Sequence, residues 1–247
     1  MILGHYGVAL AAKRAAPRAS LGTLIFAAQW ADELWPILLL IGVERVRIAP
    51  GLMAANPLDF VSYPISHSLL MVVVWGALFG LLYFVLRRYR LGAWIVGALA
   101  VSHWLLDAVV HRPDLPLWPG SAVRVGAGLW NSIAATIAIE LVLFAGGLAI
   151  YLLTTRARDR IGSWGLGAMV VVLLLIFASG FSGSPPPGER ALAVVTLGLW
   201  VFVPWGYWVD RHRELRTAPA GVRADGENYP AAQAPSSAQP SRSTRGR

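Results

Sequence analysis

Three titratable side chains recur at intervals of four residues in an otherwise apolar stretch of the sequence: His103, Asp107 and His111. On a helix this spacing places them on one face, with roughly 5–6 Å between neighbouring Cβ atoms. Neutral imidazole nitrogens and carboxylate oxygens are ligands for Zn²⁺ and similar divalent ions. The pattern therefore predicts a metal site, and a buried hydrogen-bonded network between helices is the alternative interpretation.

Further ionisable side chains interrupt other apolar segments: Asp32, Glu33, His67 and Glu140. Such groups are costly at membrane depth and usually face a bundle interior or a wet cavity. Adjacent Asp32 and Glu33 point about 100° apart on a helix, so we expect only one of them at a shared site and favour Asp32. Glu140 could bind a metal, act as a general base, or hydrogen-bond to a histidine ligand or a neighbouring helix.

Several classes of site are excluded by composition. The chain has no cysteine, so it can form neither a disulfide framework nor a thiolate metal site nor a cysteine nucleophile. It also has no HExxH pattern, which excludes the helical zinc protease arrangement. A metal site must therefore use His, Asp and Glu. Asp59 and Asp114 lie between the apolar segments, and we expect both to be solvated loop residues.

The segments that carry these residues are long and apolar. Of 247 residues, 56% are hydrophobic and 14% are charged, against roughly 25% charged in soluble domains. This composition excludes a soluble globular enzyme and a wholly disordered chain. A membrane-spanning helix needs about 20 mostly apolar residues. Six segments meet that requirement: 20–43, 63–86, 91–111, 129–153, 161–181 and 190–209.

We therefore expect an all-α, polytopic transmembrane helix bundle over residues 1–216. Its first dozen residues are apolar but too short to span, and we expect a half-inserted or interfacial helix there. Residues 217–247 are rich in Pro, Ala, Ser, Gln and Arg. This composition cannot bury a core, so we expect a disordered cytoplasmic tail.

Basic residues indicate the orientation of the bundle. Twelve would lie on one side of the membrane: Lys13, Arg14, Arg18, Arg87, Arg88, Arg90, Arg156, Arg158, Arg160, Arg211, Arg213 and Arg216. Five would lie on the other: Arg45, Arg47, Arg112, Arg124 and Arg190. The positive-inside rule then predicts a multi-pass membrane protein with both termini in the cytoplasm. The same rule accounts for most of the net charge of +8, so we expect no nucleic-acid partner.

In this orientation the polar groups of four spans share one layer. At 1.5 Å per residue, they lie about 6–16 Å below the external ends of their helices. A shared depth in the outer half of the membrane favours one common site.

Four short motifs in this order resemble a known family: Gly4-His5, Ala31-Asp32, Ser66-His67-Ser68 and Ser102–Asp107. The chain is similar over roughly residues 1–155 to membrane-bound metal-dependent hydrolases of bacterial inner membranes, which are distantly compared with zinc-dependent phospholipases C. The resemblance implies metal ligands among His5, Asp32, His67, His103 and Asp107. Composition alone would leave His5 at the interface.

The chain departs from the family pattern at two places. Ala31 stands where the family often has proline, and Tyr63-Pro64-Ile65-Ser66 stands where it often has His-Arg-Gly and Thr. The missing arginine weakens an inference about phosphate binding.

The sequence thus predicts a metal-dependent hydrolase that acts on a lipid-like or phosphoester substrate from the bilayer. The ion, expected to be Zn²⁺, would lower the pKa of a bound water from 15.7 toward about 7, and Glu140 or Asp32 would accept the proton. A transporter or ion-handling protein that uses the same polar groups is the alternative, and a purely structural membrane protein is a third. The oligomeric state stays open.

Overall fold

The computed structural model describes residues 1–216, and the tail predicted over residues 217–247 lies outside the described residues. Six segments are long and apolar enough to cross a membrane. They are α2 (Leu21–Leu40), α3 (Leu69–Arg87), α4 (Arg90–Val110), α5 (Ile133–Thr154), α6 (Arg160–Ser182), and a last segment made of α7 (Glu189–Thr196), the 3₁₀ turn η2 (Leu197–Val201) and α8 (Phe202–Arg211). The predicted all-α bundle with six candidate spans is confirmed.

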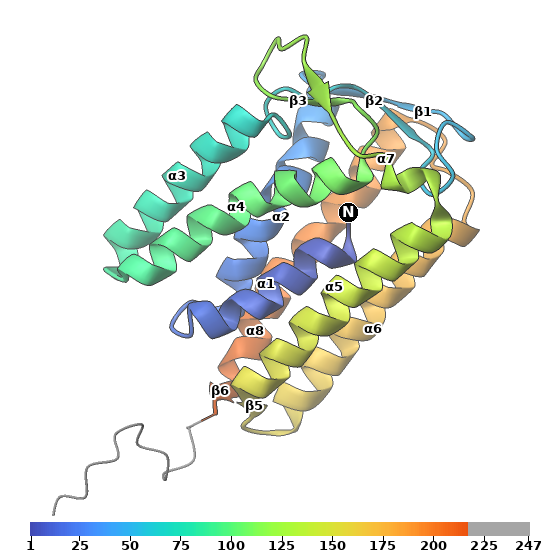
Figure 1. Ribbon diagram of the computed structural model, residues 1–247. Coiled ribbons are helices and arrows are strands. Elements are labelled where there is room, and N and C mark those ends of the chain that lie inside the picture. Colours follow the sequence, from blue (N-terminus) through green and yellow to red (C-terminus); the bar gives the residue numbers. More distant parts are fainter. Residues whose placement is uncertain (217–247) are drawn as a thin grey trace, which may run out of the picture. The chain divides into compact units, whose positions relative to one another are not determined.

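A shorter helix, α1 (Leu3–Ala15), is inserted among the long ones and packs against α5, α2 and α4 (Figure 1). Its residues Leu3, His5 and Tyr6 are at most 1% exposed. A helix of 13 residues is about 20 Å long, short of the roughly 30 Å of a bilayer core. The sequence predicted either a half-inserted or an interfacial helix, and the burial of α1 among the other helices favours the half-inserted one.

Glycines allow α1 to lie close to α5. A Cβ atom on Gly147 would collide with the carbonyl oxygen of Gly7, and a Cβ atom on Gly7 would collide with the backbone of Leu143. Small residues at membrane helix interfaces permit this close approach of two backbones. The position of α1, and with it the position of His5, depends on this contact.

The second span begins at Leu69 because the residues before it form a turn. The hydroxyl of Ser68 accepts a hydrogen bond from the amide of Met71 at 3.4 Å, as a helix N-cap does. The same hydroxyl donates to the carbonyl oxygen of Pro64 at 2.6 Å. His67 therefore lies in a turn just before α3, and its side chain is not placed by helical periodicity.

Small two-stranded antiparallel sheets lie at the ends of the bundle. They are β1 (Arg45–Ile48) with β2 (Leu58–Ser62), β3 (Leu115–Pro116) with β4 (Arg124–Val125), and β5 (Thr155–Ala157) with β6 (Arg213–Leu215). The first two lie at one end and the third lies at the other (Figure 1). A 3₁₀ turn, η1 (Leu129–Asn131), precedes α5.

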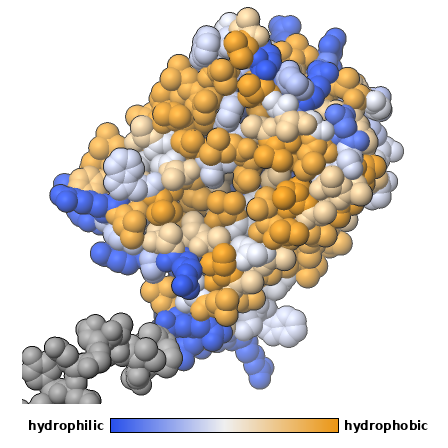
Figure 2. All heavy atoms as spheres, viewed as in Figure 1, coloured by the Kyte–Doolittle hydropathy of each residue, from blue (hydrophilic) through white to orange (hydrophobic). Residues whose placement is uncertain are grey.

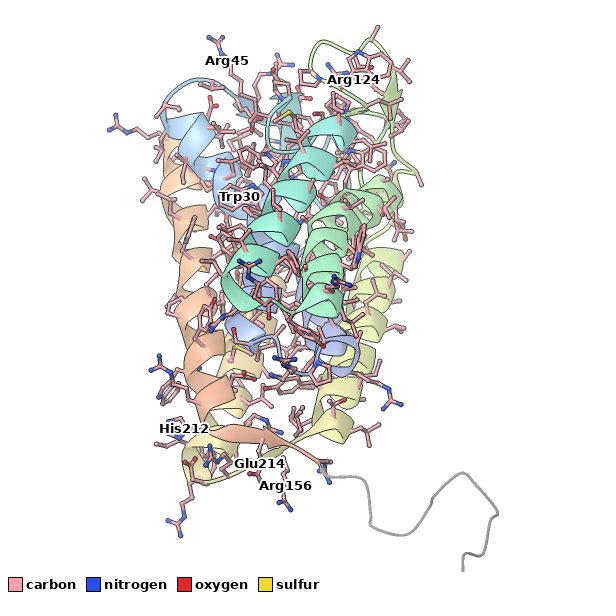
Figure 3. All side chains as sticks on the ribbon, turned by 90° about the vertical axis from the view of Figure 1, so that its left-hand side faces the viewer. Trp30, Arg45, Arg124, Arg156, His212 and Glu214 are labelled. Carbon is pink, nitrogen blue, oxygen red and sulfur yellow. The ribbon has the colours of Figure 1, made fainter. Side chains whose placement is uncertain are left out.

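The sides of the bundle are apolar, whereas hydrophilic residues gather toward its ends (Figure 2). Leu81 and Leu86 of α3, for example, are 62% and 70% exposed. Figure 3 shows Arg45 and Arg124 at one end and Arg156 at the other. An apolar lateral surface between two charged ends is the pattern expected of a protein surrounded by lipid.

Candidate metal centre

Five of the predicted site residues meet inside the bundle. They come from α1 (His5), α2 (Asp32), the turn before α3 (His67) and α4 (His103 and Asp107). Ligand atoms of His5, His103 and Asp107 lie within 4.8 Å of one another, and so do those of Asp32, His67 and His103. Because His103 belongs to both groups, the five residues form one unit, which we call the His–Asp cluster.

The His–Asp cluster is enclosed except at Asp32. The side chains of its other four residues are at most 3% exposed, whereas that of Asp32 is 22% exposed. Glu33 does not join the cluster, in agreement with the helical angle that separates it from Asp32. Asp32 therefore marks the side from which a small molecule could reach the cluster.

Two of the histidines form a hydrogen bond through Nδ1, the ring nitrogen that points away from the cluster, and this bond determines which nitrogen carries the proton. Nδ1 of His103 lies 2.8 Å from the carbonyl oxygen of Ala28, which can only accept, so this nitrogen carries the proton. The hydroxyl of Ser66 donates to Glu44 and therefore accepts from Nδ1 of His67 at 2.7 Å. Each neutral ring then directs an unprotonated Nε2 atom toward the carboxylates.

Four acceptor atoms consequently face one another. Nε2 of His103 lies 3.1 Å from Oδ2 of Asp107 and 3.8 Å from Oδ1 of Asp32. Nε2 of His67 lies 3.4 Å from Oδ1 of Asp32 and 3.7 Å from Oδ2 of Asp107. Ligands about 2.0–2.1 Å from a tetrahedral Zn²⁺ are separated by roughly 3.3–3.4 Å, a value that lies within the range of these four nitrogen–oxygen distances.

The donor set also fits a cation chemically. Nε2 of His103 is buried and has no hydrogen-bond partner among residues 1–216. Lone pairs of imidazole nitrogens and carboxylate oxygens repel one another at these distances unless a positive charge lies between them. Imidazole nitrogens and carboxylate oxygens are both donors that Zn²⁺ accepts.

His5 contacts the cluster from one side. Its ring stacks on that of His103, with centroids 3.7 Å apart and planes inclined by 10°. Its Nε2 atom lies 3.1 Å from Oδ1 of Asp107, and the α-amino group of Met1 donates to the same oxygen at 2.7 Å. Asp107 thus uses one oxygen toward His5 and Met1 and turns the other toward His67 and His103.

Glu140, a predicted catalytic residue, lies against the start of α1. Its Oε1 atom accepts from the amide of Ile2 at 3.3 Å, and its Oε2 atom accepts from the amide of Gly4 at 3.2 Å. A carboxylate at a helix N-terminus satisfies free amides and is favoured by the helix dipole. This placement makes Glu140 a positioning residue for α1, which carries His5.

His111, a predicted metal ligand, is not brought to the His–Asp cluster. Helix α4 ends at Val110, and His111 has an extended backbone, so the four-residue periodicity does not reach it. Its Nδ1 atom lies 2.9 Å from Oδ1 of Asp114, and its ring lies against Phe60 and Trp130. Only His103 and Asp107 of the original three-residue pattern therefore share a site.

A charged network covers the same end of the bundle. Asp114 accepts from His111 and from the hydroxyl of Tyr63 at 2.7 Å, and Arg112 bridges Asp59 and Asp114. Asp59 and Asp114 are only 9% and 8% exposed, so the expectation that they are solvated was wrong. Tyr63 reaches Asp114 and Arg112 reaches Asp59 from more than 50 residues away, and local composition does not reveal such contacts.

Burial sets most of the protonation states in this network. Burial lowers the pKa of His111. It raises the pKa of Tyr63, and the charge of Asp114 raises it further. Burial also opposes ionisation of Asp114, but hydrogen bonds, above all from His111, lower its pKa below the usual 3.8. At neutral pH, a neutral imidazole and a neutral phenol therefore donate to an ionised carboxylate.

Sequence reasoning missed Glu44, which is fully buried beneath the turn before α3. In the sequence it follows the first span and precedes Arg45, an arrangement typical of a solvated loop. Its contact with Ser66 exists because β1 and β2 bring the intervening chain back on itself. No local spacing indicates that contact.

Comparison with known proteins identifies a family. The family model of the YdjM inner membrane proteins matches residues 1–184, a range that contains the whole His–Asp cluster. No curated protein and no solved structure matches the chain. The match supports the predicted inner membrane family, whereas the hydrolase activity stays a prediction.

Proposed function

The chain belongs to the YdjM inner membrane protein family, and on that premise we propose that it is a metal-dependent hydrolase of the membrane. Its His–Asp cluster would hold a divalent ion, with Zn²⁺ expected for this donor set. Its substrate would be a lipid-like ester or phosphoester. The observation that carries the proposal is the close approach of the Nε2 atoms of His67 and His103 to oxygens of Asp32 and Asp107, at 3.1–3.8 Å, inside the bundle.

The residues of the His–Asp cluster would have different chemical roles. A bound divalent ion supplies an acidified water and polarises the bond that is attacked. His67, His103 and Asp107 are buried and held by further hydrogen bonds, so they suit the role of ligands. Three protein ligands would leave the fourth position of the ion to the water. Asp32, the partly exposed member, would then accept the proton of that water instead of binding the ion. Asp32 is therefore favoured over Glu140 as the base.

The position of the cluster favours a substrate that resides in the membrane. His67 lies in the short segment between β2 and α3, and aromatic rings of Trp35 and Tyr63 pack around it. The lateral surface next to this end of the bundle is apolar (Figure 2). A lipid would present its ester or phosphoester bonds near such an end while its chains stay beside the helices.

Transport, the alternative function, receives less support. Toward the opposite end of the bundle, α1 and α2 bury Leu10, Leu21, Leu24 and Ile25, each at most 1% exposed, in one apolar core. A polar path for ions across the bundle would have to cross this core. An enclosed site near one end suits chemistry better than passage.

Metal analysis of the purified protein tests the proposal. We expect about one equivalent of divalent metal in the parent protein. His103→Ala should remove that metal because it deletes the imidazole, and Asp107→Asn should remove it because a neutral amide replaces the anionic carboxylate. His212→Ala is the matched control, since His212 lies at the other end of the bundle, bonded to Asp159 (Figure 3). Equal metal contents in all four proteins would contradict the proposal.

An activity assay tests the role of Asp32. A chromogenic phosphodiester in mixed micelles is the first substrate to use. Chelation should abolish hydrolysis and Zn²⁺ should restore it. Asp32→Asn, assayed in saturating Zn²⁺, should lower kcat by about 10²–10⁴-fold, the usual contribution of a general base. Undiminished turnover in that variant would exclude Asp32 as the base.

A further inference from the structure

Glu44 is a buried carboxylate that accepts three hydrogen bonds. Its Oε1 atom accepts from the amides of Ile65 and Ser66, each at 2.8 Å, and its Oε2 atom accepts from the hydroxyl of Ser66 at 2.6 Å. The residue is 0% exposed. A buried charge is tolerated when it is hydrogen-bonded in this way. Two of the three bonds hold the turn before α3, but the third leads toward the His–Asp cluster.

The third hydrogen bond, from the hydroxyl of Ser66 to Glu44, fixes which atom Ser66 can donate to. A serine hydroxyl has a single proton, and Ser66 donates it to Glu44. The same oxygen lies 2.7 Å from Nδ1 of His67 and can therefore only accept there. Nδ1 of His67 must then carry a proton, which leaves the lone pair of the neutral ring on Nε2, 3.4 Å from Asp32.

We infer that Glu44 is a positioning residue that fixes the tautomer of His67 through the hydroxyl of Ser66. His103 reaches the same tautomer through the carbonyl oxygen of Ala28, a main-chain group that substitution cannot remove. His67 instead depends on two side chains. The consequence for metal binding rests on the proposed function, whereas the tautomer itself is a property of the metal-free protein.

Glu44→Gln separates this role from a purely structural one. The carbonyl oxygen of the glutamine can still accept from the amides of Ile65 and Ser66, so the turn keeps its two main-chain bonds. Its NH₂ group, however, would donate to the Ser66 hydroxyl. That hydroxyl would then donate to Nδ1 of His67, and the proton of the neutral ring would move to Nε2, which faces the cluster.

The test is ¹⁵N NMR of metal-free, ¹⁵N-histidine-labelled protein in detergent at about pH 8, where an ordinary imidazole is neutral. His67→Gln identifies the signals of His67. We expect protonated Nδ1 in the parent protein and protonated Nε2 in Glu44→Gln. In a Ser66→Ala background, Glu44→Gln should have no effect on the ring. An unchanged tautomer in a folded Glu44→Gln protein would overturn the inference, and so would protonated Nε2 in the parent.

Ser66→Ala alone keeps the inference testable if Glu44→Gln does not fold. This variant retains Glu44 and its two main-chain donors but removes the acceptor for Nδ1. The ring should then show a mixture of tautomers, and retention of a single Nδ1-protonated form would contradict the relay.

Zn²⁺ affinity gives the second readout, measured by competition with a chelating indicator. Mutating the hydrogen-bond partner of a metal-ligating histidine usually lowers metal affinity by about 10–100-fold. Glu44→Gln should weaken Zn²⁺ binding by at least about 10-fold. When Ser66 is already alanine, adding Glu44→Gln should weaken Zn²⁺ binding much less, because the serine that links the two residues is gone. If the parent protein binds no Zn²⁺ while the tautomer still switches, the proposed function fails and the relay stands. If Zn²⁺ binds normally and the tautomer does not switch, the relay fails and the function stands.

Discussion

The pKa directions of two neighbouring residues, His111 and Asp114, predict that the stability of the protein depends on pH. Burial lowers the pKa of His111 below the usual 6.5. The unfolded chain therefore takes up a proton before the folded protein does when the pH falls. His111 contributes stability that is fully present above pH 6.5 and is lost as the pH falls toward its lowered pKa. Asp114 acts in the same direction at lower pH, below its usual 3.8.

His111→Asn tests this dependence because an asparagine amide can still donate to Asp114 but does not titrate. At neutral pH the variant should be less stable by about 1 kcal/mol through lost ring packing, or roughly 2–4 °C in Tm. The difference from the parent should shrink as the pH is lowered from 7 to about 5. Thermal unfolding in detergent across this range measures it. A constant difference would show that His111 does not carry the effect.

Among the site residues, the sequence alone could bring together only those that lie on the same helix. His103 and Asp107 are four residues apart, and the helix that their apolar neighbours form brings them together. His111 follows the same spacing but lies past the end of α4, and helix ends are poorly specified by local sequence. Glu44 reaches Ser66 only through the fold of the β1–β2 segment, so no sequence period could indicate it.

At the level of whole elements, α1 has to lie at a fixed depth for His5 to meet Asp107. The contact between Gly7 and Gly147 sets its distance from α5. Gly147→Ala should force the two helices apart and destabilise the protein by about 1–3 kcal/mol, as overpacking usually does. Because His5 moves with α1, the same variant should also bind less metal.

Gly146→Ala is the matched control for this prediction. Its added Cβ atom would meet nothing within 4 Å, and alanine favours a helix over glycine by up to about 1 kcal/mol. Tm should therefore be unchanged or higher in this neighbour and lower in Gly147→Ala. Equal Tm and metal content in both variants would show that the glycine contact does not position α1.

The helices themselves follow from the sequence more readily than their packing does. Long apolar runs predicted the six candidate spans, because main-chain polar groups in lipid must be satisfied within a helix. The insertion of α1 between α2, α4 and α5 depends on glycine contacts and on Glu140 binding the first amides of α1. Such contacts between distant segments leave no signal in hydropathy.

For the molecule as a whole, orientation decides from which side a substrate would reach the site. One end of the bundle carries β1 and β2 with Arg45 and Arg124 (Figures 1 and 3). The His–Asp cluster lies toward this end, because its His67 is in the short segment between β2 and α3. The opposite end carries β5 and β6 with Arg156 and Glu214 (Figure 3). Because basic residues are concentrated toward this second end, the positive-inside rule predicts that it faces the cytoplasm and that the cluster faces outward.

Cysteine labelling tests this orientation directly, because the chain has no cysteine of its own. Val123, 50% exposed, lies next to Arg124, and Arg158, with 60% of its side chain exposed, follows β5. In intact spheroplasts, a membrane-impermeant maleimide should label Val123→Cys and should label Arg158→Cys only after the membrane is permeabilised. The reverse pattern would place the cluster at the cytoplasmic side. The proposed hydrolysis would then act on a substrate drawn from the inner leaflet, by the same chemistry.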